Sequence, residues 1–293
     1  MTTQSADHLN LRGALLMVAA MGAFRLTDAG MKFGLETLPM GEVIVLRTLP
    51  TMVLLGVAAW VFGAFQAIPR KDRLPVSGAV GAEIVGNWFM LSALAAVPFA
   101  IVIGALQVHP LMMAAFGALV LGERIGPRRW TAIVIGFLGV MLILQPWDDA
   151  VGLYGFFLVF GVVAAIMARD LSARYTSAET PSLLIALLSG AGAGVFGLVL
   201  GLFESWVWPD QLTLLVVSGT GVSVALAYVL AIAAIRTGQL GVVAPFRYSA
   251  LIWGGVLGFV FFGEMPNALA LIGAVIVVAA GLFVLWRGAA AKA

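Results

Sequence analysis

Ten long apolar stretches constrain this chain more than any other feature. A helix needs about 20 residues to cross the hydrocarbon core of a bilayer, and each stretch has roughly that length. They span residues 12–33, 41–64, 74–96, 98–121, 129–145, 151–173, 181–203, 211–235, 240–262 and 267–287. Only 10% of the residues are charged, against about 25% in soluble domains. Since helices satisfy their own backbone in lipid, the sequence predicts an all-α membrane protein with ten transmembrane helices.

The basic residues are strongly biased toward one side of the predicted membrane. With a cytoplasmic N-terminus, 12 of the 16 Lys and Arg residues lie on the cytoplasmic side, namely Arg12, Arg70, Lys71, Arg73, Arg124, Arg128, Arg129, Arg169, Arg174, Arg236, Arg287 and Lys292. The other four lie within or at the edge of spans. This bias predicts a multi-pass protein of a bacterial-type inner (plasma) membrane with both termini in the cytoplasm. The first ten residues show no cleavable signal peptide.

A repeat relates the two halves of the chain, predicted as residues 1–146 and 147–293. Charged and proline residues recur at an offset of 141 or 142, in the pairs Asp28 and Asp170, Lys32 and Arg174, Pro39 and Pro181, and Glu123 and Glu264. Each half contains five spans, so the second half is predicted to be inverted in the membrane. Inverted repeats around a central cavity are typical of secondary transporters.

Two junctions carry a resemblance to a known family. They are LVLGERIGPRRWTAIVIGFLGVMLIL at 119–144 and FFGEMPNALALIGAVIVVAAGLFVL at 261–285. The chain resembles the EamA-type, ten-helix branch of the drug/metabolite transporter superfamily. That resemblance implies an exporter or exchanger of amino acids, nucleotide sugars, sugar phosphates or other metabolites. It also implies a cavity lined by the first, third, fourth, sixth, eighth and ninth helices. After Glu264, Met-Pro-Asn replaces the basic turn of the pattern.

Polar side chains near the middle of the third and fourth spans are candidates for substrate binding. Glu83 and Asn87 are four residues apart, so they share one helix face. A carboxylate at this depth suits an ammonium group or a proton, and ionisable residues inside membranes are usually functional. Histidine, present here as His109, is the side-chain type that titrates near neutral pH, and the following Pro110 frees a backbone carbonyl. For Glu83, Asn87 and His109 alike, the alternative to substrate binding is a structural role, in which the side chain bonds to or packs against neighbouring helices.

Arg247 is the candidate in the ninth span. Pro245 breaks the helix beside it, and Phe246 and Tyr248 flank it. A guanidinium on irregular backbone suits a carboxylate or phosphate. The alternative is a salt bridge from Arg247 to Glu83.

Trp88 and Tyr228 are weaker candidates for the binding site, and Arg25, about three residues past the middle of the first span, is expected to face the cavity. Aromatic residues in spans more often pack against neighbours than bind ligands. Asp28 and Arg47 are expected at similar depth on antiparallel neighbours, and we interpret them as a structural ion pair.

These features favour a secondary active transporter that works by alternating access. Arg247, with Glu83 or Asn87 for the ammonium group, favours amino acids as substrates, including apolar and aromatic ones. A proton is a candidate coupling ion, and transport direction is left open. There are two alternatives. One is an intramembrane enzyme that acts on a lipid-linked substrate, with Glu83 and His109 as acid and base, and the other is a channel.

The sequence has no Cys and no nucleotide-binding or zinc-protease motif, so we expect no metal, cofactor or nucleic acid. We expect a monomer to be competent for transport, and a dimer is also compatible with the sequence.

Overall fold

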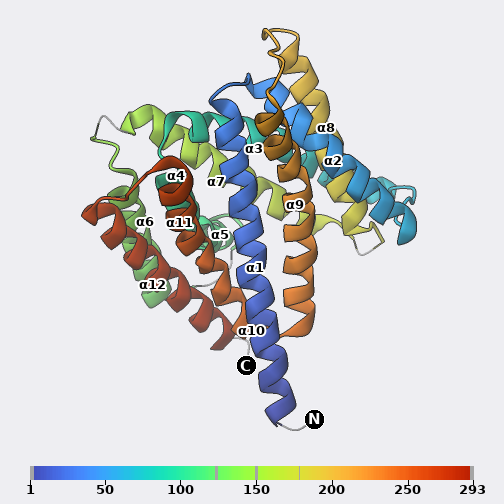
Figure 1. Ribbon diagram of the computed structural model, residues 1–293. Helices are drawn as coiled ribbons and strands as arrows, with labels where there is room; N and C mark the ends of the chain where they lie inside the picture. The colour runs from blue at the N-terminus through green and yellow to red at the C-terminus, as the bar shows by residue number, and fades with distance from the viewer. Residues whose placement is uncertain (1–2, 123–124, 149–150, 178, 291–293) are drawn as a thin grey trace. The chain divides into compact units, whose positions relative to one another are not determined.

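The computed structural model describes residues 3–122, 125–148, 151–177 and 179–290, which form helices joined by short connections (Figure 1). Its helices are α1 (Thr3–Leu35), α2 (Met40–Val61), the 3-10 helix η1 (Arg70–Asp72), α3 (Arg73–Ala96), α4 (Phe99–Leu106), α5 (His109–Leu119), α6 (Pro127–Leu144), α7 (Gly152–Tyr175), α8 (Ser182–Gly201), α9 (Gln211–Thr237), α10 (Leu240–Val243), the 3-10 helix η2 (Ala244–Tyr248), α11 (Ser249–Phe262) and α12 (Ala268–Ala290). Ten helical stretches within these described residues are long and apolar enough to span a membrane, which confirms the predicted fold class. Glu123, used in the repeat argument, lies outside the described residues.

Two of the ten spans are interrupted, the fourth near its middle and the ninth in its first third. The fourth consists of α4 and α5, and between them the amides of Gln107 and Val108 bond to carbonyls only three residues back, at 3.2 and 3.1 Å. The ninth consists of α10, η2 and α11. Pro110 and Pro245 contribute no N–H to the helical ladder, and a proline ring clashes with the preceding turn. The two breaks follow from these prolines.

The helices pack into two compact units. Unit 1 contains residues 1–25, 96–156 and 226–293, and unit 2 contains residues 26–95 and 157–225. Each unit combines segments from both halves of the sequence. Packing therefore does not follow the predicted boundary between residues 146 and 147, and the two repeats as domains stay a prediction.

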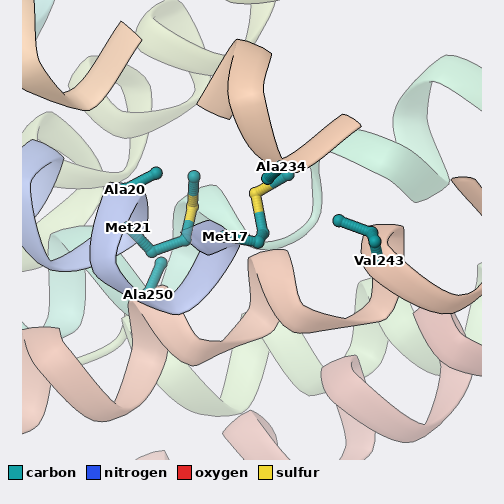
Figure 2. Packing of buried hydrophobic residues seen from close by; sticks show 6 residues of the cluster. All are labelled: Met17, Ala20, Met21, Ala234, Val243 and Ala250. Carbon is teal, nitrogen blue, oxygen red and sulfur yellow. The ribbon is translucent and has the colours of Figure 1, made fainter. Parts of the chain in front are cut away.

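Unit 1 has an apolar core that joins α1, α9, α10 and α11. Its buried members are Met17, Ala20, Met21, Ala234, Val243 and Ala250. Figure 2 shows the methionine side chains of α1 beside the small residues of the other helices. Methionine is flexible enough to fill the irregular spaces between helices that cross at different angles.

Repeat-related helices pack against each other within each unit. In unit 1, α6 lies along α12, and in unit 2, α2 lies along α8. Facing glycines permit both crossings: a Cβ on Gly139 would lie 2.9 Å from the Gly273 carbonyl oxygen, and one on Gly197 would lie 3.0 Å from that of Gly41. Small residues allow such close backbone approach in membranes.

Carboxylates fasten the helix ends of unit 2. The Gly41 amide donates to Glu204 at 2.8 Å, and the Val207 amide donates to Glu42 at 3.0 Å. Glutamates near the first turn of a helix also suit its dipole. The α2–α8 pair is therefore held by charge-assisted hydrogen bonds at one end as well as by its glycine crossing.

Candidate functional site

A chain of hydrogen bonds links α2, α3 and α7 inside unit 2. Arg47 donates from Nη2 to Asn87 Oδ1 at 2.7 Å, and Asn87 Nδ2 donates to Glu83 Oε1 at 3.2 Å. Arg169 Nη1 donates to Glu83 Oε2 at 3.3 Å, and its Nε and Nη2 donate to Asp170 Oδ1. The prediction that Glu83 and Asn87 share one helix face is confirmed by the bond between them.

Glu83 is paired with Arg169, a residue that the sequence analysis did not select. The two side chains are 23% and 35% exposed, respectively, so the pair is shielded but not sealed from solvent. Glu83 thus accepts a hydrogen bond from another helix, α7, as in the structural alternative. Arg169 lies within the predicted span 151–173, four residues before its cytoplasmic end, and a charged side chain inside a span usually needs a partner.

Arg47 is shared between Asn87 and a methionine. Besides the bond to Asn87, its Nη1 lies 3.3 Å from Met31 Sδ on α1. Asp28, on the same helix as Met31 and in the same unit, is buried at 8% exposure. The ion pair between Asp28 and Arg47 stays a prediction.

The two interrupted spans run side by side in unit 1. A Cβ on Gly254 of α11 would meet Ile103 of α4, and one on Gly258 would meet Ala100, so the two helices are antiparallel. Extending this register by about one helical turn of 3.6 residues brings the break at Gln107–His109 level with the break at Arg247–Ser249. Interrupted helices of this kind expose backbone polar groups and build substrate sites in transporters.

The side chains around the second break point in different directions. Arg247 and Phe246 are exposed, whereas Tyr248 is buried and its ring packs on Gly281 of α12. Within the described part of the chain, the buried Tyr248 hydroxyl and Ser249 Oγ have no hydrogen-bond partner. Of the three neighbours predicted to bind substrate, Arg247 and Phe246 are thus accessible, and Tyr248 supports helix packing.

Aromatic rings gather beside the core of unit 1. Phe24 and Tyr228 meet edge to face with centroids 5.3 Å apart, and Trp253 donates from Nε1 to the Val18 carbonyl at 3.0 Å. Arg25, His109 and both rings of the edge-to-face pair are half-buried. These residues lie on α1, α5, α9 and α11, four of the elements that the resemblance assigns to the cavity.

The candidate residues are divided between the units. Arg25, His109, Tyr228, Phe246, Arg247 and Tyr248 belong to unit 1, whereas Asp28, Arg47, Glu83, Asn87 and Trp88 belong to unit 2. Trp88 is 39% exposed and stacks edge to face on Phe89. Among the described residues, no three His, Asp or Glu side chains form a group that could hold a metal ion.

Comparison with known proteins identifies the family. The model of the EamA-like transporter family matches residues 11–145. A riboflavin transporter from Rhizobium johnstonii is 30% identical over 284 residues, which cover 91% of each chain. The chain belongs to the EamA-like transporter family.

Other EamA relatives match nearly as much of the chain. A riboflavin transporter from Vibrio cholerae is 28% identical and covers 96% of this chain and 95% of its own. The pseudopaline exporter of Pseudomonas aeruginosa is 29% identical and covers 92% and 94%, respectively. A chain of known crystal structure shares the fold with a TM-score of 0.64 at 20% identity, covering 97% of this chain and 98% of that one.

The family membership settles the broad class of this protein. Like its EamA relatives, it is an integral, multi-pass membrane transporter of small molecules and not an enzyme. The sequence-based assignment to the drug/metabolite transporter superfamily is confirmed. The hypothesis of an intramembrane enzyme, with Glu83 and His109 as acid and base, is therefore set aside.

Proposed function

We propose that this protein is a secondary transporter of a small metabolite that carries an aromatic or apolar group, and that it works by alternating access. The observation that carries the proposal is the antiparallel pair of interrupted spans in unit 1, with the accessible side chains of Arg247 and Phe246 at one break. Broken helices at the middle of a membrane are the usual framework of a substrate site in inverted-repeat carriers.

Amino acids, including apolar and aromatic ones, are the first substrate candidates. Arg247 would bind the carboxylate through its planar, two-pronged guanidinium. Phe246, in the same unit, would contact the side chain. The proposed role of Glu83 or Asn87 toward an ammonium group concerns unit 2 and stands as a separate prediction. In this scheme Arg169 competes with the ammonium group for Glu83, since it already occupies one carboxylate oxygen.

A flavin-like heteroaromatic metabolite is the second candidate. The relatives from Rhizobium and Vibrio are riboflavin transporters that match more than nine-tenths of this chain. A planar ring system would suit contacts with the rings of Phe24, Tyr228 and Phe246, because aromatic groups prefer edge-to-face or offset arrangements.

Membrane placement and coupling belong to the same proposal. The charge bias supports an inner membrane with both termini in the cytoplasm. The ten spans support a monomer that is competent by itself. A proton is the proposed coupling ion, and export or exchange is the proposed direction.

Counterflow in proteoliposomes tests the substrate proposal. Vesicles loaded with each of the twenty amino acids or with riboflavin are assayed for uptake of the labelled compound. We expect saturable uptake of one group, abolished in Arg247→Ala and retained in Arg236→Ala, which removes an exposed arginine from the last turn of α9. Uptake that does not saturate would indicate a channel. Uptake that is unaffected by Arg247→Ala would remove Arg247 from the site.

A further inference from the structure

The connection between α2 and α3 in unit 2 exposes large apolar side chains. Trp60, Phe62 and Phe65 are exposed at the end of α2, with Phe62 at 79%, and Leu74 at the start of α3 is 81% exposed. The connection joins two membrane spans, Met40–Val61 and Arg70–Ala96, so it lies at a membrane surface. Aromatic side chains at this level are stabilised in the headgroup region of the bilayer, where one part of the ring system is apolar and its surroundings are wet.

Two arginines of the same connection are exposed. Arg70 on η1 and Arg73 at the start of α3 both have exposed side chains. Lys71, between them, is held instead by Glu179 at 2.6 Å. An exposed guanidinium binds a phosphate through two parallel hydrogen bonds, which an ammonium group cannot do.

The acidic residue of this connection is turned away from solvent and fixes η1 in place. Asp72 is buried, and it accepts hydrogen bonds from the Ser177 amide at 3.1 Å and from the Ser177 and Thr180 hydroxyls at 2.6 Å each. Its charge is thereby directed at the α7–α8 connection. Arg70 and Arg73 are therefore presented on a fastened turn, and the surface charge of the turn is positive.

The repeat-related connection between α8 and α9 provides a comparison within the same unit. It also exposes aromatic rings, with Phe203, Trp206 and Trp208 all exposed and Trp208 at 96%. Residues 202–210 contain no Lys or Arg but do contain Glu204 and Asp210. Both connections can therefore rest in the membrane interface, and only the α2–α3 connection has the charge to select an anionic headgroup.

We infer that Phe62, Phe65, Arg70 and Arg73 form a binding site for the headgroup of an anionic phospholipid. The two arginines take the phosphate, and the two phenylalanines enter the boundary between headgroups and acyl chains. The inference concerns the lipid environment of the transporter and is independent of the substrate proposal. It predicts that the site discriminates phosphatidylglycerol from phosphatidylcholine, which have the same acyl chains but differ in net charge.

Trp60 reports on this site in the full-length protein. The protein is reconstituted in bilayers with increasing fractions of brominated phosphatidylglycerol or brominated phosphatidylcholine, and tryptophan quenching is measured. The contribution of Trp60 is the difference between the parent and W60F. We expect brominated phosphatidylglycerol to reach half-maximal quenching at a lower lipid fraction than brominated phosphatidylcholine. The two fractions should differ by roughly fivefold for each arginine that contacts the headgroup.

Four double variants decide the outcome. R70Q/R73Q should abolish the preference for the anionic lipid, and F62S/F65S should weaken binding of both lipids. R128Q/R129Q removes the same charge at the start of α6, and F203S/W208S removes two rings from the α8–α9 connection; both should leave the preference intact. Helical circular dichroism verifies that each variant is folded.

Two results would overturn the inference. Equal loss of the preference in R128Q/R129Q would show a general effect of positive surface charge. Displacement of the lipid by excess soluble glycerol phosphate would show a site for free anions, because a headgroup held with its acyl chains in the bilayer should not be displaced by the soluble ion.

Discussion

Arg169 is the residue whose removal should tell most about the polar chain in unit 2. In Arg169→Gln the Glu83 carboxylate loses its cationic partner while it stays bonded to Asn87. Exposed ion pairs contribute about 0.2–1 kcal/mol, whereas breaking a buried pair costs about 3–5 kcal/mol. For this partly exposed pair we expect the free energy of unfolding to fall by about 1–2 kcal/mol, measured by denaturant titration in micelles.

A double-mutant cycle gives this prediction its control. Glu83→Gln combined with Arg169→Gln should recover part of the loss, because neither side chain is then left charged without its partner. Lys71→Gln breaks an exposed pair in the same unit and should leave the free energy of unfolding nearly unchanged. Additive effects of the Glu83 and Arg169 substitutions would show that the two side chains do not interact in the membrane.

Which residues lie within the helical spans was predictable from the sequence, but the direction in which their side chains point was not. Hydropathy places Glu83, Asn87 and Arg247 inside spans, and helical periodicity pairs the first two correctly. It does not show that α7 presents Arg169 to Glu83, because that contact depends on how three helices are rotated. Tyr248 illustrates the same limit: it follows Arg247 directly, yet its ring faces Gly281 on α12.

At the scale of the helix, Asp210 caps the start of α9. Its Oδ1 accepts the amides of Leu212 and Thr213 at 2.9 and 3.1 Å, and its Oδ2 accepts the Thr213 hydroxyl. The Thr213 hydroxyl, followed by the backbone amides, lowers the pKa of Asp210 below its usual 3.8. Because the pKa is lowered in the folded state, the stabilisation is fully present above pH 3.8 and is lost as the pH falls through the folded pKa.

Asp210→Ala should therefore lower the melting temperature at neutral pH, since a helix loses its N-cap. The gap between the melting temperatures of the parent and the variant should narrow once the pH drops below 3.8. Asp210→Asn keeps an acceptor oxygen without the titration, so at neutral pH it should lower the melting temperature less than Asp210→Ala, and the difference between these two variants should be independent of pH. A gap of constant width for Asp210→Ala would contradict the role of the ionised carboxylate.

The α2–α8 crossing depends on the absence of a side chain at Gly197. A Cβ there would lie 2.8 Å from Ile44 Cγ2 and 3.0 Å from the Gly41 carbonyl oxygen, and the backbone contact cannot be relieved by a rotamer change. We expect Gly197→Ala to lower the free energy of unfolding by about 1–3 kcal/mol, as overpacking does. Gly56→Ala, in α2 with no atom within 4 Å of the new Cβ, is the matched control and should be neutral or stabilising. Similar losses in both variants would indicate a general effect of alanine rather than the crossing.

The spans and their breaks were largely accessible to prediction, unlike the packing units. Continuous apolar length determines where α6 or α12 crosses, and Pro110 and Pro245 indicate where the fourth and ninth spans are interrupted. The packing units cut through α1, α7 and α9 instead. Long helices that contribute to two cores leave no change of composition at the division, so sequence alone gives no sign of it.

At the scale of the whole molecule, the inverted repeat predicts that matching connections face opposite sides of the membrane. The α2–α3 and α8–α9 connections are related by the repeat, but only the first is followed by basic residues. The chain has no cysteine, so Gln66→Cys and Ser205→Cys, both at exposed positions, give single thiols in an otherwise unreactive protein. In intact cells an impermeant maleimide should label Ser205→Cys alone, and Gln66→Cys should react only after permeabilisation. Labelling of both thiols from outside would place the two connections on the same side and remove the inverted arrangement on which alternating access depends.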